Sequence, residues 1–463
     1  MRLQTLLHRN GPALGLAVLF ALANPTAVYS ADSPQVQDLE RRIAELERIL
    51  LDIRQAQDQA KVQASAPVQV AAPVKEVAPV ANNSGNELQF SAIAQFDARF
   101  FVSGQSATGA EFDDGFLLRR IRPTWSGKVQ GIGFRIVPEL SGNGTGANIS
   151  LLDAFADVPV AANQFVRIGK QKTAVSIDRI RVATALPLIE RGLANELAPN
   201  RDLGLSLNSS WVDGRLNTVF GLFNGAADGR DVSSRDDAGK EIQARVFAEP
   251  FIHDSSVWKG LGFGVSLTHG SKKSSTGNAA NTANTLARYR SASQEEFFTY
   301  ANGVAASGTH HRLFPQLSYF HQNWGVVAEY GISEQELTRA GVEKSVRNTG
   351  YDLTLSWVPT GQPITFRGVK LGQGNSSGAV ELAFRVSGLD IDDAAYRGGA
   401  DRLADPDVAA RKARNLGVGL NWHINKAAKW SVDFNSTQFS GGALGGRDRQ
   451  EEQIVMSRFQ LVY

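Results

Sequence analysis

The sequence predicts an all-β protein, a 16-stranded antiparallel transmembrane β-barrel preceded by an N-terminal coiled-coil helix. Three observations predict the barrel. Apolar and polar residues alternate from residue 88 to 463, as in Leu416–Trp422, in segments of about ten residues that suit strands with a lipid side and a lumen side. The connections between these segments mostly alternate between short and long. All seven tryptophans lie beside the short connections, as expected for an aromatic belt at one membrane boundary.

The N-terminus, residues 1–30, has the three parts of a secretory signal peptide. Arg2 and Arg9 precede an apolar core, and Val28–Ser30 is a small-residue cleavage site. The chain is therefore predicted to be exported, and because it has no cysteine, disulfides and thiol chemistry are excluded. The formal charge of +2 becomes zero when Arg2 and Arg9 leave with the signal. A neutral chain is not a general polyanion binder, so no nucleic-acid partner is expected.

A short coiled coil is predicted over residues 31–62. Apolar residues recur at steps of three and four from Val36 to Ile53, with charged residues around them. Because about three heptads are marginal alone, an oligomer formed elsewhere should hold this helix. The alternative is an amphipathic helix lying on its own domain. Residues 63–87, rich in Ala, Pro and Val, predict an extended linker.

The barrel domain, residues 88–463, contains sixteen predicted strands. They begin near Leu88, Phe116, Ile132, Ser150, Gln164, Leu203, Leu216, Glu241, Leu261, Arg312, Trp324, Thr349, Gly378, Asn415, Trp430 and Glu451. The turn at 359–371 is longer than the other short turns, so the count could differ by a hairpin. The last strand should pair with residues 88–100, because an open apolar edge would invite aggregation.

The most informative connection is the thirty-residue stretch 173–202. A connection of this length within a compact β domain is normally functional or disordered. Its spaced Val, Ile and Leu residues are not needed in a disordered tether. We therefore expect it to fold against the inside of the barrel as an inward constriction loop, carrying Arg179, Arg181, Arg191 and Arg201.

Basic residues on the second and third strands are candidates for the lumen wall. Arg120 and Arg122 share one face of their strand, and Lys128 lies further along the same face. Arg135 alternates with apolar neighbours and should face the lumen. Arg119 has the opposite parity, so it reaches the lumen only if a bulge reorients it. Otherwise it is an arginine that extends to the membrane boundary.

Several motifs resemble the phosphate-selective porin O and P family across most of residues 90–463. They are Leu118–Arg122, Gly169–Lys172 continuing to Leu188–Arg191, Leu197–Gly204, Gly378–Arg385 and Gly417–Trp422. The resemblance implies a trimeric outer-membrane channel whose third outer loop, here 173–202, forms the constriction. It also implies that basic residues pass anions, phosphate in the best-known members. Lys170 and Lys172 match the family's lysine-bearing strand end, although simple alternation from Ile168 would point both at lipid.

The predicted function is passive diffusion of small anions, phosphate or polyphosphate, through an outer-membrane porin. The predicted anion-binding residues are Arg119, Arg120, Arg122, Lys128, Arg135, Lys170, Lys172, Arg179, Arg181 and Arg201. For each of them the alternative is a solvated charge or an ion pair with an acid such as Asp153, Asp178 or Asp202. Because the mature chain is neutral and its lumen also holds acids, a general non-selective porin remains an alternative.

The sequence also bears on two further function classes. The histidines lie in no recognisable nucleophile motif, so no enzyme, cofactor or metal site is predicted. Of the adjacent pair His310 and His311, one side chain should face inward and the other outward. A structural hypothesis makes the barrel an outer-membrane anchor that contacts the cell wall through its coiled coil.

Overall fold

The computed structural model describes residues 86–141, 149–232, 239–274, 286–372 and 378–463. These belong to the second of two units of the chain, residues 78–463. The predicted signal peptide and coiled coil, and nearly all of the predicted linker, lie outside the described residues. Among the described residues, no helix is long and apolar enough to cross a membrane.

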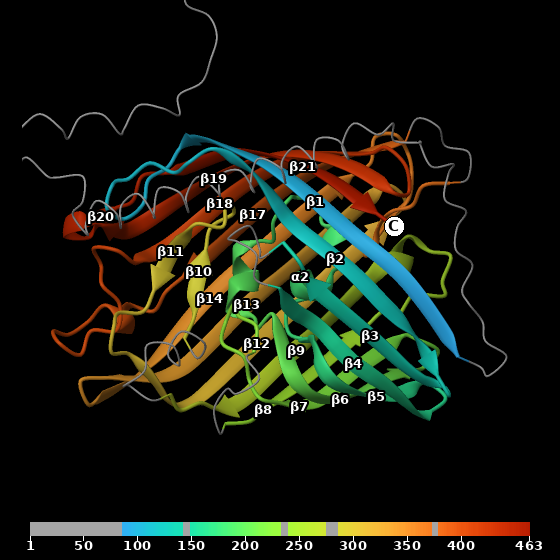
Figure 1. The fold of residues 1–463 in the computed structure, drawn as a ribbon, viewed down its shortest axis with the longest axis horizontal. Coiled ribbons are helices and arrows are strands. Elements are labelled where there is room, and N and C mark those ends of the chain that lie inside the picture. Colours follow the sequence, from blue (N-terminus) through green and yellow to red (C-terminus); the bar gives the residue numbers. More distant parts are fainter. Residues whose placement is uncertain (1–85, 142–148, 233–238, 275–285, 373–377) are drawn as a thin grey trace, which may run out of the picture. The chain divides into compact units, whose positions relative to one another are not determined.

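Sixteen long strands form one antiparallel sheet that closes on itself as a barrel (Figure 1). They are β1 (Glu87–Ser103), β2 (Gly115–Val129), β3 (Ile132–Glu139), β4 (Ser150–Ala161), β5 (Gln164–Lys172), β6 (Arg201–Trp211), β7 (Leu216–Phe223), β8 (Glu241–Ala248), β9 (Leu261–Ser271), β12 (Ala305–His321), β13 (Trp324–Arg339), β14 (Val342–Trp357), β17 (Ala379–Asp390), β18 (Ala410–His423), β19 (Ala428–Ala443) and β21 (Glu452–Val462). The predicted sixteen-stranded barrel is confirmed. The largest differences are at β12 and β14, which each begin seven residues before the predicted start.

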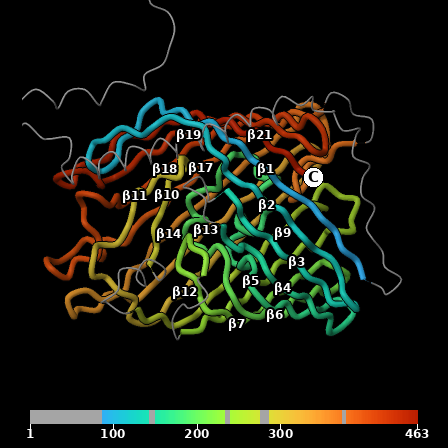
Figure 2. Tube along the Cα trace, viewed as in Figure 1, coloured from blue at the N-terminus to red at the C-terminus, as the bar shows by residue number. Residues whose placement is uncertain are grey.

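Closure joins the two ends of the described chain. β1 pairs with β2 on one side and with β21 on the other, and Figure 2 shows the last strand returning beside the first. Ile93 lies opposite Val462, and the backbone groups of Ala92 and Tyr463 exchange hydrogen bonds of 3.0 and 2.9 Å. The predicted pairing of the first and last strands is confirmed, and it leaves neither as an open edge.

Alternation along each strand separates an apolar exterior from a polar interior. On β18, Trp422 is 40% exposed, whereas its neighbour Asn421 is 1% exposed. All seven tryptophans are exposed on the barrel surface. Trp324 and Trp357, which lie opposite each other on β13 and β14, stack with ring centroids 5.5 Å apart. The tryptophans lie toward the short-turn end, as an aromatic belt requires.

The connections on either side of β14 depart from the alternation of short turns and long loops. β13 and β14 meet in a two-residue turn at the long-loop end, where Ala340 and Gly341 both have positive φ. At the short-turn end, the connection between β14 and β17 forms a small hairpin of β15 (Ile364–Thr365) and β16 (Gly368–Val369). The extra length seen in the sequence is therefore a hairpin that lies outside the barrel wall's own sheet.

The remaining short elements lie in connections. These are α2 (Ile177–Ile180), η2 (Ala183–Ala185), η3 (Leu193–Leu197), η4 (Val257–Gly260), β10 (Arg288–Arg290), β11 (Glu296–Thr299), η5 (Asp393–Ala395), η6 (Leu444–Gly446) and β20 (Arg447–Asp448). β10 pairs with β11, and the two residues of β20 pair with the end of β19.

The connection between β5 and β6, residues 173–200, is here called the inward loop. It carries α2, η2 and η3, and Figure 1 shows it within the barrel. Leu193 and Leu197 of η3 pack in one buried cluster with Val346 of β14 and Phe298 of β11. The loop thus places its spaced apolar residues against the far wall and against a second loop, which gives a physical reason for their presence.

Candidate functional site

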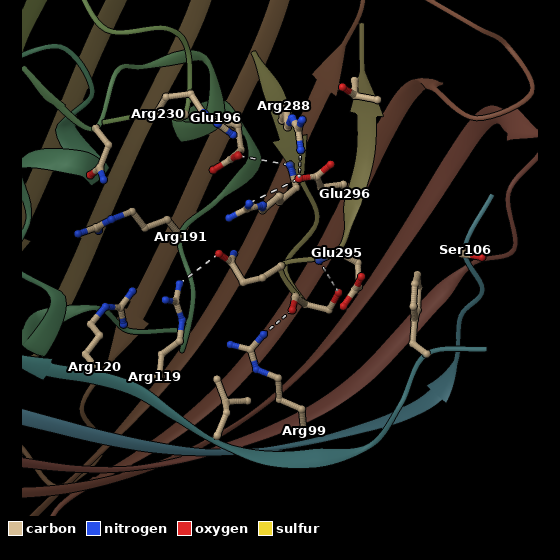
Figure 3. A pocket seen from close by; sticks show the side chains of 18 of the residues that line it. Arg99, Ser106, Arg119, Arg120, Arg191, Glu196, Arg230, Arg288, Glu295 and Glu296 are labelled. Carbon is tan, nitrogen blue, oxygen red and sulfur yellow. Dashed lines mark hydrogen bonds and ion pairs between the residues drawn. The ribbon is translucent and has the colours of Figure 1, made fainter. Parts of the chain in front are cut away.

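A cavity of about 970 Å³ lies inside the barrel, beside the inward loop. Its other walls come from β1, β2 and the connection between them, from residues 229–231, and from residues 288–299 of the long connection after β9. Twelve Arg and Lys residues line it, against five Asp and Glu residues. Figure 3 shows arginines converging on it from different elements, Arg119 and Arg120 from the wall and Arg191 from the inward loop. The cavity is therefore strongly basic.

A β-bulge places two consecutive arginines of β2 inside the barrel. Gln95 of β1 pairs with Arg120, but the next residue, Phe96, pairs with Leu118, so Arg119 is the extra residue of the bulge. An extra residue breaks the strict alternation of a strand. Arg119 consequently points inward like Arg120, and both line the cavity. The sequence predicted that Arg119 would face the lumen only if a bulge reoriented it, and this bulge does so.

Glu190 of the inward loop lies among four arginines of the barrel wall. Arg119 Nε lies 2.7 Å from its carboxylate, Arg458 Nη2 2.9 Å, Arg99 Nη2 3.2 Å and Arg120 Nη2 3.5 Å. Burial would raise the pKa of Glu190, but Arg119, Arg120 and the other two arginines outweigh burial and hold the pKa well below its usual range. Glu190 therefore remains a carboxylate.

The backbone around Glu190 is fixed to the same wall. Arg458 donates to the Ile189 carbonyl at 2.6 Å, and Arg385 donates to the Glu190 carbonyl at 2.7 Å. The Ile189 amide in turn donates to Asp433 at 2.7 Å. Because these partners come from β21, β17 and β19, this part of the inward loop is held on the side of the barrel opposite its own strands.

Two more predicted cations of the cavity are paired with acids. Arg122 Nε lies 2.6 Å from Glu139 of β3, and Arg201 Nε lies 2.7 Å from Asp153 of β4. Arg122 and Arg201 thus form ion pairs, as Arg119 and Arg120 do, which was the alternative to an anion-binding role for each of them. Their charge is largely balanced within the protein, so they contribute less attraction for a passing anion than their number suggests.

Three other cations of the cavity have mainly neutral partners. Lys172 Nζ donates to the carbonyls of Arg179 and Arg181, each at 3.1 Å. Arg179 donates to Asn200 Oδ1 at 3.0 Å and to the Asn195 carbonyl at 3.2 Å. Arg191 donates to the carbonyls of Asp178 and Arg181 at 2.6 and 2.9 Å, and Asp178 Oδ1 is 3.6 Å away. We call Lys172, Arg179 and Arg191 the cationic triplet.

Burial controls the pKa values of the triplet's two loop arginines. Burial lowers the pKa of Arg191 to about 9, although Asp178 opposes the shift. Burial also lowers the pKa of Arg179, against the opposing effect of Glu196. A cation whose charged form is disfavoured gains from any anion that approaches it. The triplet is thus the part of the cavity best suited to attract an anion.

The other predicted cations lie away from the cavity. Arg181 is buried on the far side of the inward loop, where it donates to the Phe366 carbonyl at 3.2 Å and approaches the ring of Phe320. Lys128 and Arg135 are exposed near the short-turn end, and Lys170 is half-buried. The structure therefore brings Arg119, Arg120, Arg122, Lys172, Arg179 and Arg201 together and leaves these four outside the cavity.

Sequence reasoning did not select several residues that line the cavity. These are Arg99, Arg191, Arg230, Arg288, Arg290 and Arg449, together with the acids Glu196, Glu295 and Glu296. Arg191 had a usable signal, because it ends the motif Leu188–Arg191. The residues from 286 to 299 had none, since only the folding of their loop toward the barrel interior places them there.

A closed barrel with an apolar exterior, a charged interior and a loop folded into that interior defines an outer-membrane channel of the porin class. The chain belongs to the family described as phosphate-selective porin O and P, which matches residues 94–463. The resemblance seen in the sequence is therefore confirmed. Membership supports an outer-membrane location for this protein.

Solved structures of outer-membrane proteins share the fold. The outer-membrane channel DcaP of Acinetobacter baumannii is 9% identical, with a TM-score of 0.53, and the match covers 84% of this chain and 100% of that chain. An anion-selective porin from Comamonas acidovorans is 12% identical, with a TM-score of 0.50 and coverage of 82% and 100%. OmpT of Vibrio cholerae in its trimer form is 8% identical, with a TM-score of 0.50 and coverage of 82% and 100%. A comparison with curated proteins gives no match.

Proposed function

We propose that the protein is a passive channel that favours small anions, with phosphate as the permeant class. The observation that carries the proposal is the cationic triplet, whose members face the cavity and are bound mainly by neutral groups. Arg offers a planar fork that suits phosphate oxygens, and Lys offers a mobile point charge. Several such weak sites along a path attract an anion yet release it.

Weak anion preference without phosphate specificity is the second candidate. It is favoured by the ion pairs of the wall, where Glu190 serves four arginines and Glu139 serves Arg122. Charge that is balanced in this way attracts any small anion only modestly. The two candidates differ in whether phosphate competes with chloride inside the channel.

The assembly is proposed to be a homotrimer in outer-membrane lipid. Support comes from the family and from OmpT of Vibrio cholerae, an outer-membrane protein of similar fold that is described in a trimer form. The coiled coil and its contact with the cell wall remain predictions from the sequence. Deleting residues 32–61 tests them, because a tether predicts loss of envelope integrity with unchanged conductance.

The deciding measurement is single-channel conductance in planar bilayers, with phosphate titrated into a chloride electrolyte. We expect the chloride conductance to fall saturably with phosphate. Lys172→Gln should weaken this block by about tenfold or more, because a hydrogen bond to a charged group contributes about 1.5–3 kcal/mol. A block that is equally strong in this variant would exclude the triplet as the phosphate site.

The matched control is Lys412→Gln. Lys412 is an exposed cation on β18 that does not line the cavity, so its loss should leave the phosphate block unchanged. Currents that ignore phosphate in the unmodified protein while a salt gradient still shows anion preference would select the second candidate.

A further inference from the structure

A second hollow, of about 410 Å³, indents the outer surface of the barrel. Its floor is apolar and lies across four neighbouring strands, β8, β9, β12 and β13. The floor residues are Ile242 and Ala244 of β8, Leu267 of β9, Leu313 of β12 and Ile332 of β13. Ile242 is 44% exposed and Leu267 is 49% exposed. This floor is therefore part of the lipid-facing surface.

The hollow has a polar rim on the side of the long loops. His269 follows Leu267 by two residues, His311 precedes Leu313 by two, and Glu334 follows Ile332 by two, so each rim residue shares the outward face of its floor neighbour. The sheet register places His269 opposite His311, His311 opposite Glu334, and Glu334 opposite Arg347. The rim is thus one row across β9, β12, β13 and β14.

The two rim histidines form a close pair. Their Nδ1 atoms are 2.9 Å apart and their ring centroids are 4.6 Å apart. Their outward direction contrasts with that of His310, which is buried and contacts Ser333 at 2.9 Å. The adjacent histidines therefore point to opposite faces, as their spacing predicted. Each imidazole keeps its Nε2 available to a ligand on the outer surface.

The rim also holds a cation, Arg347, that lies opposite Glu334 in the sheet but forms no ion pair with it. Within the described ranges, the Arg347 side chain has no hydrogen-bond or ion-pair partner, whereas its neighbour Glu334 accepts from Ser345 at 3.2 Å. The arginine just beneath the rim, Arg312, is balanced by Asp228 at 2.6 Å and Glu241 at 2.7 Å. The rim therefore carries one guanidinium, Arg347, and one carboxylate, Glu334, and neither forms an ion pair within the described ranges.

We propose that the hollow binds a phosphorylated lipid of the outer leaflet. The acyl chain lies on the apolar floor, and the phosphate contacts Arg347 and the pair His269 and His311. The row marks the level at which outward side chains change from apolar to charged, which is where lipid headgroups lie. A guanidinium and an imidazole Nε2–H match phosphate oxygens as hydrogen-bond donors. Of the two histidines, the one whose Nδ1 accepts from the other ring carries that Nε2–H. The site is on the outer wall, so it does not depend on the proposed anion path.

The test measures lipid retained by the purified full chain, in detergent doped with diphosphoryl lipid A, by native mass spectrometry. We expect one retained lipid per barrel and about fivefold less in Arg347→Ala with His311→Ala, because charge-assisted hydrogen bonds to phosphate are lost. Lipid A stripped of its phosphates should be retained as poorly by the unmodified protein. Lys412→Ala, the loss of an exposed cation outside the hollow, should retain lipid normally.

A second variant fills the hollow and leaves every charge in place. Ala244→Phe should also lose the lipid, with unchanged single-channel conductance as the check that the barrel folds. The proposal is overturned if dephosphorylated lipid A is retained equally, or if Lys412→Ala loses as much lipid as the rim variant. It is also overturned if Ala244→Phe changes only the number of chains per assembly, which would make this face a contact between copies.

Discussion

Glu190→Ala is expected to free the inward loop from the barrel wall and to raise the single-channel conductance. The change removes the one carboxylate shared by Arg99, Arg119, Arg120 and Arg458. Removing one partner of a buried ion pair costs about 3–5 kcal/mol, because the remaining charge is left without compensation. The measurement is the size of single-channel conductance steps in planar bilayers, together with the current noise. Larger and noisier steps would indicate that the loop is released from the wall.

The pH dependence of the unmodified channel follows from the same contacts. The pKa of Glu190 is held well below its usual range. A depressed folded pKa means that the stabilisation is complete above the ordinary value of about 4.3 and is lost only as pH falls through the folded pKa. We therefore expect the conductance of the unmodified channel to stay constant from neutral pH to about pH 4.

Glu296→Ala is the matched control for Glu190→Ala. Glu296 lines the same cavity but forms exposed pairs with Arg288 at 3.5 Å and Arg290 at 3.6 Å. Such surface pairs contribute about 0–1 kcal/mol, so the conductance should hardly change. If both variants conduct alike, Glu190 does not anchor the loop. Glu190→Gln keeps a hydrogen-bond acceptor, so its conductance should lie between those of Glu190→Ala and Glu296→Ala.

The barrel itself was predictable because its rule is local. Alternation with period two, turn residues and the tryptophans each act within about ten residues, and they located all sixteen strands. The ends of strands were less accurate. β12 extends back to Ala305, where small residues continue the strand without an alternating signal. Periodicity therefore gives the order of strands better than their length.

The candidate site was only partly predictable because its contacts are distant in sequence. Glu190 and Arg458 are 268 residues apart, and they meet only because the inward loop crosses the barrel. Arg119 was ambiguous because a bulge is not visible in the pattern of residues. Lys172 lies three residues after Gly169, whose φ is +127°, and it lines the cavity although alternation from Ile168 would point it at lipid. At both positions the side chain departs from strict alternation and lines the interior cavity.

Arg312→Met is expected to lower the thermal stability of the folded barrel by a large margin at neutral pH. Arg312 is fully buried, where it binds Asp228 and Glu241 and donates to the Ala226 carbonyl at 2.9 Å. Asp228 also accepts from the hydroxyl of Tyr289 at 3.1 Å, so the network fixes two loops. Stranding two buried carboxylates costs about 3–5 kcal/mol. The temperature at which the folded form is lost in detergent measures the change.

The difference in thermal stability between the unmodified protein and the Arg312→Met variant should narrow on acidification. In the unmodified protein, burial would raise the pKa of Asp228, but Arg312 and then His310 hold it below its usual range. That stabilisation is present above the ordinary carboxyl pKa of about 3.9 and is lost as pH falls. Without Arg312, burial raises the pKa of Asp228, so the variant regains stability as this carboxyl takes up a proton.

The control is Arg290→Met, which removes an exposed pair with Glu296 and should lower the free energy of unfolding by about 0–1 kcal/mol. A gap that is independent of pH would show that packing around Arg312, and not its charge, holds these loops.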